Sequence, residues 1–160
     1  MADKGVGHIS TSIFPDEIKS ALSGNLTFDV AINAEGVHKW VYCTKAITST
    51  AAIFTTANDY FDGVAVADTD IAKYIAIKHS GTSDGSNTTS AGLMLSINGE
   101  AAAYNDDDGI FLEPGEMIVL KCPWIEVQNI RAIAVTITNG KPSAAAGTVQ
   151  IIAAAILDDH

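Results

Sequence analysis

The 160-residue chain has the length of one domain, and hydrophobic residues make up 48% of it against 18% charged residues. This apolar content excludes extensive disorder, because enough side-chain area is available to offset the entropy lost on ordering. The net charge of −10 repels phosphates, so neither a nucleic acid nor an anionic membrane is an expected partner. No window approaches the roughly 18 apolar residues of a membrane-spanning helix, and the polar residues 1–12 do not resemble a signal peptide.

The first predicted element is a short helix over residues 15–22. Pro15 stands at its first position, acidic residues fill the first turn, and Gly24 ends it. The residues before this helix are expected to form an arm. The predicted organisation is therefore an N-terminal arm with a short helix over 1–25, followed by one sandwich domain over 26–160.

From residue 26 onward, apolar residues recur at every second position, which is the pattern of strands with one buried face. Residues 26–33 show it clearly, and 37–46 is expected to return as their hairpin partner. Further apolar runs, separated by clusters of Gly, Asn, Asp, Ser and Pro, lie at 51–57, 63–67, 74–79, 92–98, 109–112, 116–121, 131–138 and 148–157. About eight to ten short strands with such turns predict an all-β fold, a single antiparallel β-sandwich of jelly-roll type.

The last of these runs is apolar on both of the faces that a strand would present, with Gln150 as the exception. A strand of this kind needs cover on both faces, and a neighbouring subunit is one source of that cover. A short helix, favoured by the alanines, and an internal strand under a long loop are the alternatives. We interpret the run, together with apolar residues of the arm, as a subunit interface formed by Val149, Ile151, Ile152, Ala153, Ala155, Leu157, Ile9, Ile13 and Phe14.

One motif suggests catalysis. Residues 81–85 match the Gly-x-Ser-x-Gly pattern of a nucleophile elbow, which would make Ser83 the nucleophile of a hydrolase. The elbow requires a strand before the serine and a helix after it. Residues 86–90 are poor helix formers, so a mobile hairpin tip is favoured and no enzyme is predicted.

Other patterns suggest ligands. The acidic turn 105–109 has carboxylates suited to Ca²⁺, but it does not match the EF-hand spacing and a solvated turn is favoured. Trp40 and Trp124 are candidates for a carbohydrate platform, although a tryptophan in a strand is more often core or interface. Cys43 and Cys122 lie in apolar runs without metal-binding spacing and are expected to be core residues. No cofactor and no metal are predicted.

The second half of the chain has a recognisable order of elements. Residues 74–78 are followed by a polar loop, by 93–100, by 110–120 with its Pro-Gly-Glu turn, and by two closing apolar strands within 130–157. This order resembles small β-rich virion structural proteins of tailed bacteriophages, in particular capsid decoration (cement) proteins.

The resemblance implies a non-enzymatic structural protein that stabilises the capsid shell by binding between major capsid subunits. It further implies association with itself as a homotrimer, location on the capsid surface and synthesis in the host cytoplasm. A tail, neck or fibre-associated structural protein is the alternative within the same class. A carbohydrate-binding module or lectin, using Trp40, Trp124 and the acidic turn, is the alternative of another class.

Overall fold

The computed structural model describes residues 3–9, 24–30, 39–55, 66–99, 101–103 and 109–158. The strands that it contains alternate with short turns, and one 3₁₀ helix follows the eighth strand. In chain order the elements are β1 (Asp3–Ile9), β2 (Gly24–Val30), β3 (Lys39–Ile47), β4 (Ala51–Ala52), β5 (Ile71–His79), β6 (Gly92–Ser96), β7 (Ile110–Leu112), β8 (Met117–Glu126), η1 (Val127–Asn129), β9 (Arg131–Thr138), β10 (Lys141–Ala145) and β11 (Val149–Asp158).

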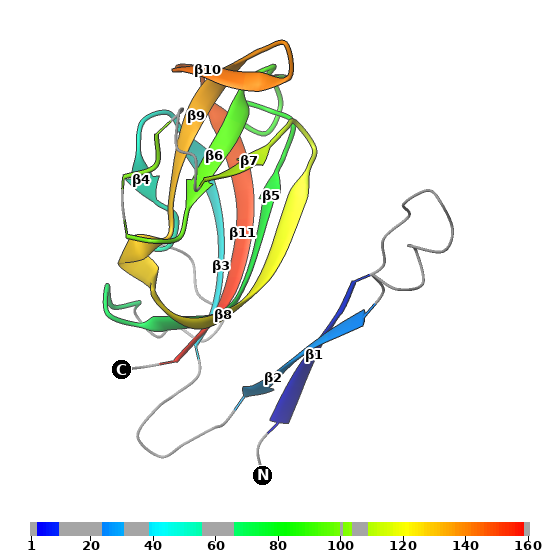
Figure 1. Cartoon of the computed structure of the whole chain (residues 1–160), viewed down its shortest axis with the longest axis vertical. Helices are drawn as coiled ribbons and strands as arrows, with labels where there is room; N and C mark the ends of the chain where they lie inside the picture. The colour runs from blue at the N-terminus through cyan, green and yellow to red at the C-terminus, as the bar shows by residue number, and fades with distance from the viewer. Residues whose placement is uncertain are drawn as a thin grey trace.

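Two antiparallel sheets pack against each other. One has the strand order β3-β11-β5-β8, and the other has the order β10-β9-β6-β7 with β4 also paired to β9. In Figure 1 the strands β9, β6 and β7 lie in front of the four strands of the first sheet. The prediction of an all-β antiparallel sandwich is confirmed.

The core lies between the two sheets and is built from the inward-facing half of each strand. Ile75 and Ile77 of β5 and Ile151 of β11 are completely buried, and they belong to the same cluster as Leu93 and Leu95 of β6. These residues alternate along each strand with residues that face outward, because successive side chains of a strand point to opposite faces. The two-residue period seen in the sequence therefore corresponds to the buried faces of the two sheets.

The predicted Pro-Gly turn joins the two sheets between β7 and β8. The amide of Glu116 donates to the carbonyl of Glu113 at 3.0 Å, and Gly115 adopts a φ of 90°. Glycine adopts this positive φ without strain. The proline ring fixes the φ of the position before the glycine at the value that the turn requires. The side chain of Glu116 also accepts a hydrogen bond from the amide of Glu113 at 2.7 Å, so the turn closes on itself and directs β8 along the sheet edge.

The pairing of the first strands differs from the prediction. The segment 26–33 was expected to form a hairpin with 37–46, but β2 pairs with β1 and β3 pairs with β11, so this expectation is wrong. The reason is that β3 pairs with β11 over a continuous nine-residue register, along which Val41, Cys43 and Ile47 are buried in the core. The helix predicted over 15–22 lies outside the described residues.

Candidate interaction surface

Strand β11 occupies an interior position of its sheet, between β3 and β5. Its inward-facing residues are buried by the second sheet of the same chain, which leaves almost none of their area for the predicted contact with another subunit. These residues are Val149, Ile151, Ala153, Ala155 and Leu157, each no more than 2% exposed. Ile152 faces outward and is 37% exposed, so it remains a candidate contact. Ile9 lies in β1, whereas Ile13 and Phe14 lie outside the described residues.

The outward side of this sheet presents large hydrophobic side chains to solvent. We call it the four-stranded face. By register its central part consists of Tyr42, Thr44 and Ala46 of β3, Gln150, Ile152, Ala154 and Ile156 of β11, Tyr74, Ala76 and Lys78 of β5, and Met117, Val119 and Lys121 of β8.

Large apolar side chains on this face remain in contact with water. Tyr42 is 39% exposed, Ile152 is 37% exposed and Met117 is 54% exposed. Between Ile152 and Met117 lies a shallow groove of about 140 Å³, whose floor is formed by the small side chains of Ala76 and Ala154. Contiguous apolar surface of this kind marks sites of protein association.

The charge distribution on the four-stranded face differs from that of the whole chain. In its central part Lys78 and Lys121 are the charged residues, whereas the carboxylates of Asp158 and Glu126 stand at the strand ends. Asp158, at the end of β11 beyond this central part, is paired with Lys73 at 2.8 Å. The face therefore suits an apolar partner surface that has carboxylates at its margin.

The outward side of the other sheet is covered by the chain itself. Met94 of β6 and Val135 of β9 point away from the central core, yet both are almost completely buried with Ala102 in a second small cluster. The carbonyl of Ala102 accepts a hydrogen bond from the Thr50 hydroxyl at 2.7 Å, which holds this segment on the sheet. Of the four exposed large hydrophobic side chains among the described residues, three lie on the four-stranded face and the fourth is Trp124 of β8.

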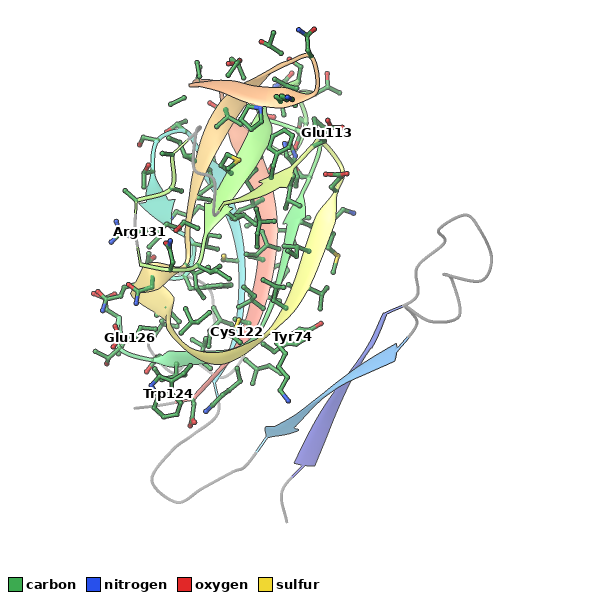
Figure 2. The ribbon with its side chains drawn as sticks, viewed as in Figure 1. Tyr74, Glu113, Cys122, Trp124, Glu126 and Arg131 are labelled. Atoms are coloured by element: carbon green, nitrogen blue, oxygen red, sulfur yellow. The ribbon has the colours of Figure 1, made fainter. Side chains whose placement is uncertain are left out.

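The tryptophans assigned to a carbohydrate platform lie in strands at opposite edges of one sheet. Trp124 of β8 is 65% exposed, and the Lys73 ammonium lies 5.1 Å from the centroid of its ring. Figure 2 shows Trp124 projecting from the end of the sandwich. Trp40 belongs to β3, three strand spacings from β8, which corresponds to roughly 15 Å. The structure does not bring these two strands together.

The loop after β5 contains Ser83 and is held by a dense set of hydrogen bonds. A bridge joins Thr82 to Thr88, so the chain doubles back at the point where a nucleophile elbow would continue into a helix. The Ser83 hydroxyl donates to the carbonyl of Asn87 at 3.3 Å. Amides of Asn87 and Ser86 donate to the Asp84 carboxylate, and these bonds hold its pKa below the usual value.

His79, the nearest histidine along the chain, is completely buried at the end of β5. Its Nδ1 accepts a hydrogen bond from the Gly81 amide at 3.0 Å, which leaves Nε2 as the donor to the Ala91 carbonyl at 2.9 Å. Burial lowers the pKa of His79, against the opposing influence of the Ala91 carbonyl and of Glu116. Both ring nitrogens are occupied by backbone groups, so this histidine is arranged to fasten the loop rather than to activate Ser83.

The cysteines occupy the core, as the sequence predicts. Cys43 and Cys122 are free thiols, 2% and 3% exposed. Burial raises the pKa of Cys122 to about 11, so its thiol is protonated at neutral pH. Within the described residues no group of three or more His, Cys, Asp or Glu side chains is placed to hold a metal. The acidic turn lies largely outside those residues, so its expected character as a solvated turn stays a prediction.

Comparisons with protein families, with curated proteins and with solved structures find no match for this chain. In the described part of the chain, no helix has the length and apolar character needed to cross a membrane. The geometry of the four-stranded face is therefore the main basis for inferring a function.

Proposed function

We propose that this protein is a non-enzymatic structural subunit of a virion, of the capsid decoration type, which binds between major capsid subunits. The observation that carries the proposal is the four-stranded face, an apolar surface whose central part has two lysines and no carboxylate in a chain of net charge −10. The mechanism is burial of this surface against neighbouring protein subunits, which stabilises the shell without chemistry.

The energetics of the face support association with protein. Burying apolar area contributes about 25 cal/mol per Å², and the exposed parts of Tyr42, Ile152 and Met117 are available for it. Lys78 and Lys121 would meet carboxylates of the partner, and such charges mainly set specificity and the rate of encounter. Charged residues make up only 18% of the chain, and this low content agrees with a surface that is largely covered in an assembly.

The strand order supports the same class of protein. We interpret the sandwich as a jelly roll, because β3-β11-β5-β8 and β4-β9-β6-β7 each combine strands from both ends of the chain. Jelly rolls are common in viral capsid proteins and also in lectins. The succession of elements over 74–157 that resembles phage decoration proteins favours the virion role, with a homotrimer on the capsid surface as the expected assembly.

Electron microscopy of particles with a gold-labelled antibody against the purified chain tests the proposal. Label over the heads supports a decoration protein. Label confined to tails, necks or fibres would replace it with the alternative in the same class. Particles without label, combined with chelator-sensitive binding to a glycan array, would replace it with a lectin.

A second experiment tests the surface itself. Purified chain is added to particles that lack it, and the bound fraction is measured after sedimentation. Ile152→Asp places a carboxylate on the four-stranded face and is expected to lower binding at least tenfold. Ala146→Asp, in the exposed turn before β11, is the matched control and should bind like the unmodified chain. Equal binding by both variants would exclude this face as the contact.

A further inference from the structure

Strand β8 forms an open edge of the sandwich. It is the last strand in the order β3-β11-β5-β8, and β5 is its partner along one side. In Figure 1 it is the yellow strand at the border of the two packed sheets. No other strand of the described residues pairs with its outer side. A row of unpaired backbone groups of this kind is a template for pairing with another strand.

The hydrogen bonds of β5 determine which residues of β8 point outward. The amide of His79 donates to the carbonyl of Glu116 at 2.8 Å, so His79 and every second residue before it direct their backbone groups at β8. The register places Ile118 and Leu120 opposite these residues, so both are bonded to β5. The residues that alternate with them direct their N–H and C=O groups away from β5, and these are Met117, Val119 and Lys121.

The other edges of the two sheets have features that hinder pairing. β4 and β7 have only two and three residues, and β10 contains Pro142 beside a register shift. β3 has Lys45 on its inward side, where the ammonium donates to the carbonyl of Ala52 at 2.7 Å. Short strands, prolines, bulges and inward-pointing charges all protect an edge from pairing. Residues 117–120 of the ten-residue β8, Met-Ile-Val-Leu, have none of these features.

The chain covers the inward side of this edge incompletely. Ile118 and Leu120 pack against the central core but are only partly buried, whereas the residues opposite them on β5, Ile77 and Ile75, are completely buried. On the outward side Met117 is 54% exposed. A strand added along β8 would therefore remove apolar area from water on both sides of the sheet, which is favourable.

We propose that β8 of one copy pairs antiparallel with β8 of a second copy, centred on Val119. A two-fold axis at Val119 places Met117 opposite Lys121 of the second copy, and Ile118 opposite Leu120 of the second copy. The two lysines then lie four residues apart, about 13 Å along the strands. Like charges do not meet, and the partly buried apolar residues cover each other.

The pairing joins two four-stranded sheets into one continuous sheet. The two-fold axis is perpendicular to the sheet, so the four-stranded faces of both copies point the same way and stay accessible to the shell. The inference goes beyond the proposed function, because it concerns contact between copies and not contact with the shell. On a particle, the junction would connect one expected trimer to the next.

Disulfide cross-linking of the full chain tests the pairing. Val119→Cys lies on the axis, opposite its own counterpart, where paired Cα atoms are about 5.5 Å apart and within reach of a disulfide. Under mild oxidation this variant should form a two-chain species at least tenfold faster than Ala146→Cys, a matched control in the exposed turn before β11. The native thiols of Cys43 and Cys122 are buried, so they should not contribute.

Two further variants test the register. Met117→Cys and Lys121→Cys each lie about 13 Å from their own counterparts, so neither should cross-link alone, whereas an equimolar mixture of the two should. Circular dichroism verifies the fold of each variant. Equal rates for Val119→Cys and Ala146→Cys, cross-linking of Met117→Cys alone at the Val119→Cys rate, or no cross-linking in the mixture would each overturn the proposal.

Hydrogen exchange of the unmodified chain tests the pairing without a substitution. The Val119 amide points outward and the Leu120 amide is bonded to β5, so in dilute protein the first should exchange fast and the second slowly. In concentrated protein the Val119 amide should exchange at least tenfold more slowly, and an unchanged rate would overturn the pairing. None of these results alters the particle labelling, so a failure here is separable from a failure of the proposed function.

Discussion

Two adjacent isoleucines on β11 offer a direct test of the register of this strand. Ile151 is 0% exposed and faces the second sheet, whereas Ile152 is 37% exposed on the four-stranded face. Substituting isoleucine by alanine removes three carbons, worth about 0.8 kcal/mol each in transfer from water. At Ile151 a cavity also remains, and Ile151→Ala is expected to lower the free energy of unfolding by about 3–4 kcal/mol.

At Ile152 water replaces the lost carbons and no cavity forms, so Ile152→Ala should lower the free energy of unfolding by about 1 kcal/mol. Guanidinium denaturation followed by tryptophan fluorescence measures both values. In thermal unfolding, the Ile151→Ala loss corresponds to a decrease of roughly 6–16 °C in Tm for a chain of this size.

The measurement should be repeated at several protein concentrations, because association of copies makes apparent stability depend on concentration. The difference between the two losses should persist at every concentration, because β11 is an interior strand and takes no part in the pairing of copies. Equal losses in dilute protein, or a larger loss at Ile152, would refute the reasoning, because a slip of one residue exchanges the two faces of the strand.

Three further outcomes follow from other parts of the sandwich. Because the pKa of His79 is lowered in the folded protein, the unfolded chain takes up the proton first, so this contribution to stability should be complete above about pH 6.5 and fall as the pH drops from there through the folded pKa. The difference in unfolding free energy between His79→Gln and the unmodified chain, measured from pH 7 to 5, should show this slope. A flat difference would contradict it. Gly92→Ala should lower the free energy of unfolding by about 1–3 kcal/mol, because its Cβ would lie 2.5 Å from the Phe111 ring, and unchanged denaturant midpoints would argue against that packing. Cys43 and Cys122 should resist a thiol reagent at pH 8 in the native protein and react fully in guanidinium; rapid native labelling would show that the core opens.

Local sequence pattern predicted the parts of the fold that depend on local chemistry. Alternation over 131–138 corresponds to β9, and the proline and glycine at 114–115 form the turn into β8. These features were predictable because side-chain period and turn geometry are set by neighbouring residues.

Pairing over long distances in the chain was not predictable in the same way. The sequence next to β3 suggests β2 as its partner, whereas the actual partner, β11, lies about a hundred residues later. Two-sided apolarity of β11 suggested cover on both sides, and the structure shows this cover on the inner side. It did not indicate that the second sheet of the same chain supplies the inner cover, because a strand's partners depend on the assembled topology.

The candidate surface was predictable only in part for the same reason. Ile152 belongs both to the predicted interface and to the four-stranded face. Tyr42 and Met117 were missed, since each lies in a different strand and they come onto one face only when β3, β11, β5 and β8 align. A signal that was present is that the acidic residues at outward positions stand at the ends of these strands, as Asp158 and Glu126 do, but recognising it requires the strand order.

The interior position of β11 has a consequence for biosynthesis. β3 and β5 emerge from the ribosome early, yet the strand that joins them is the last of the described strands to be made. Until then both carry unpaired backbone groups along one edge, and such edges associate readily with other chains. The nascent protein is therefore expected to depend on protection from aggregation throughout its translation, and to close its sheet in a single late step.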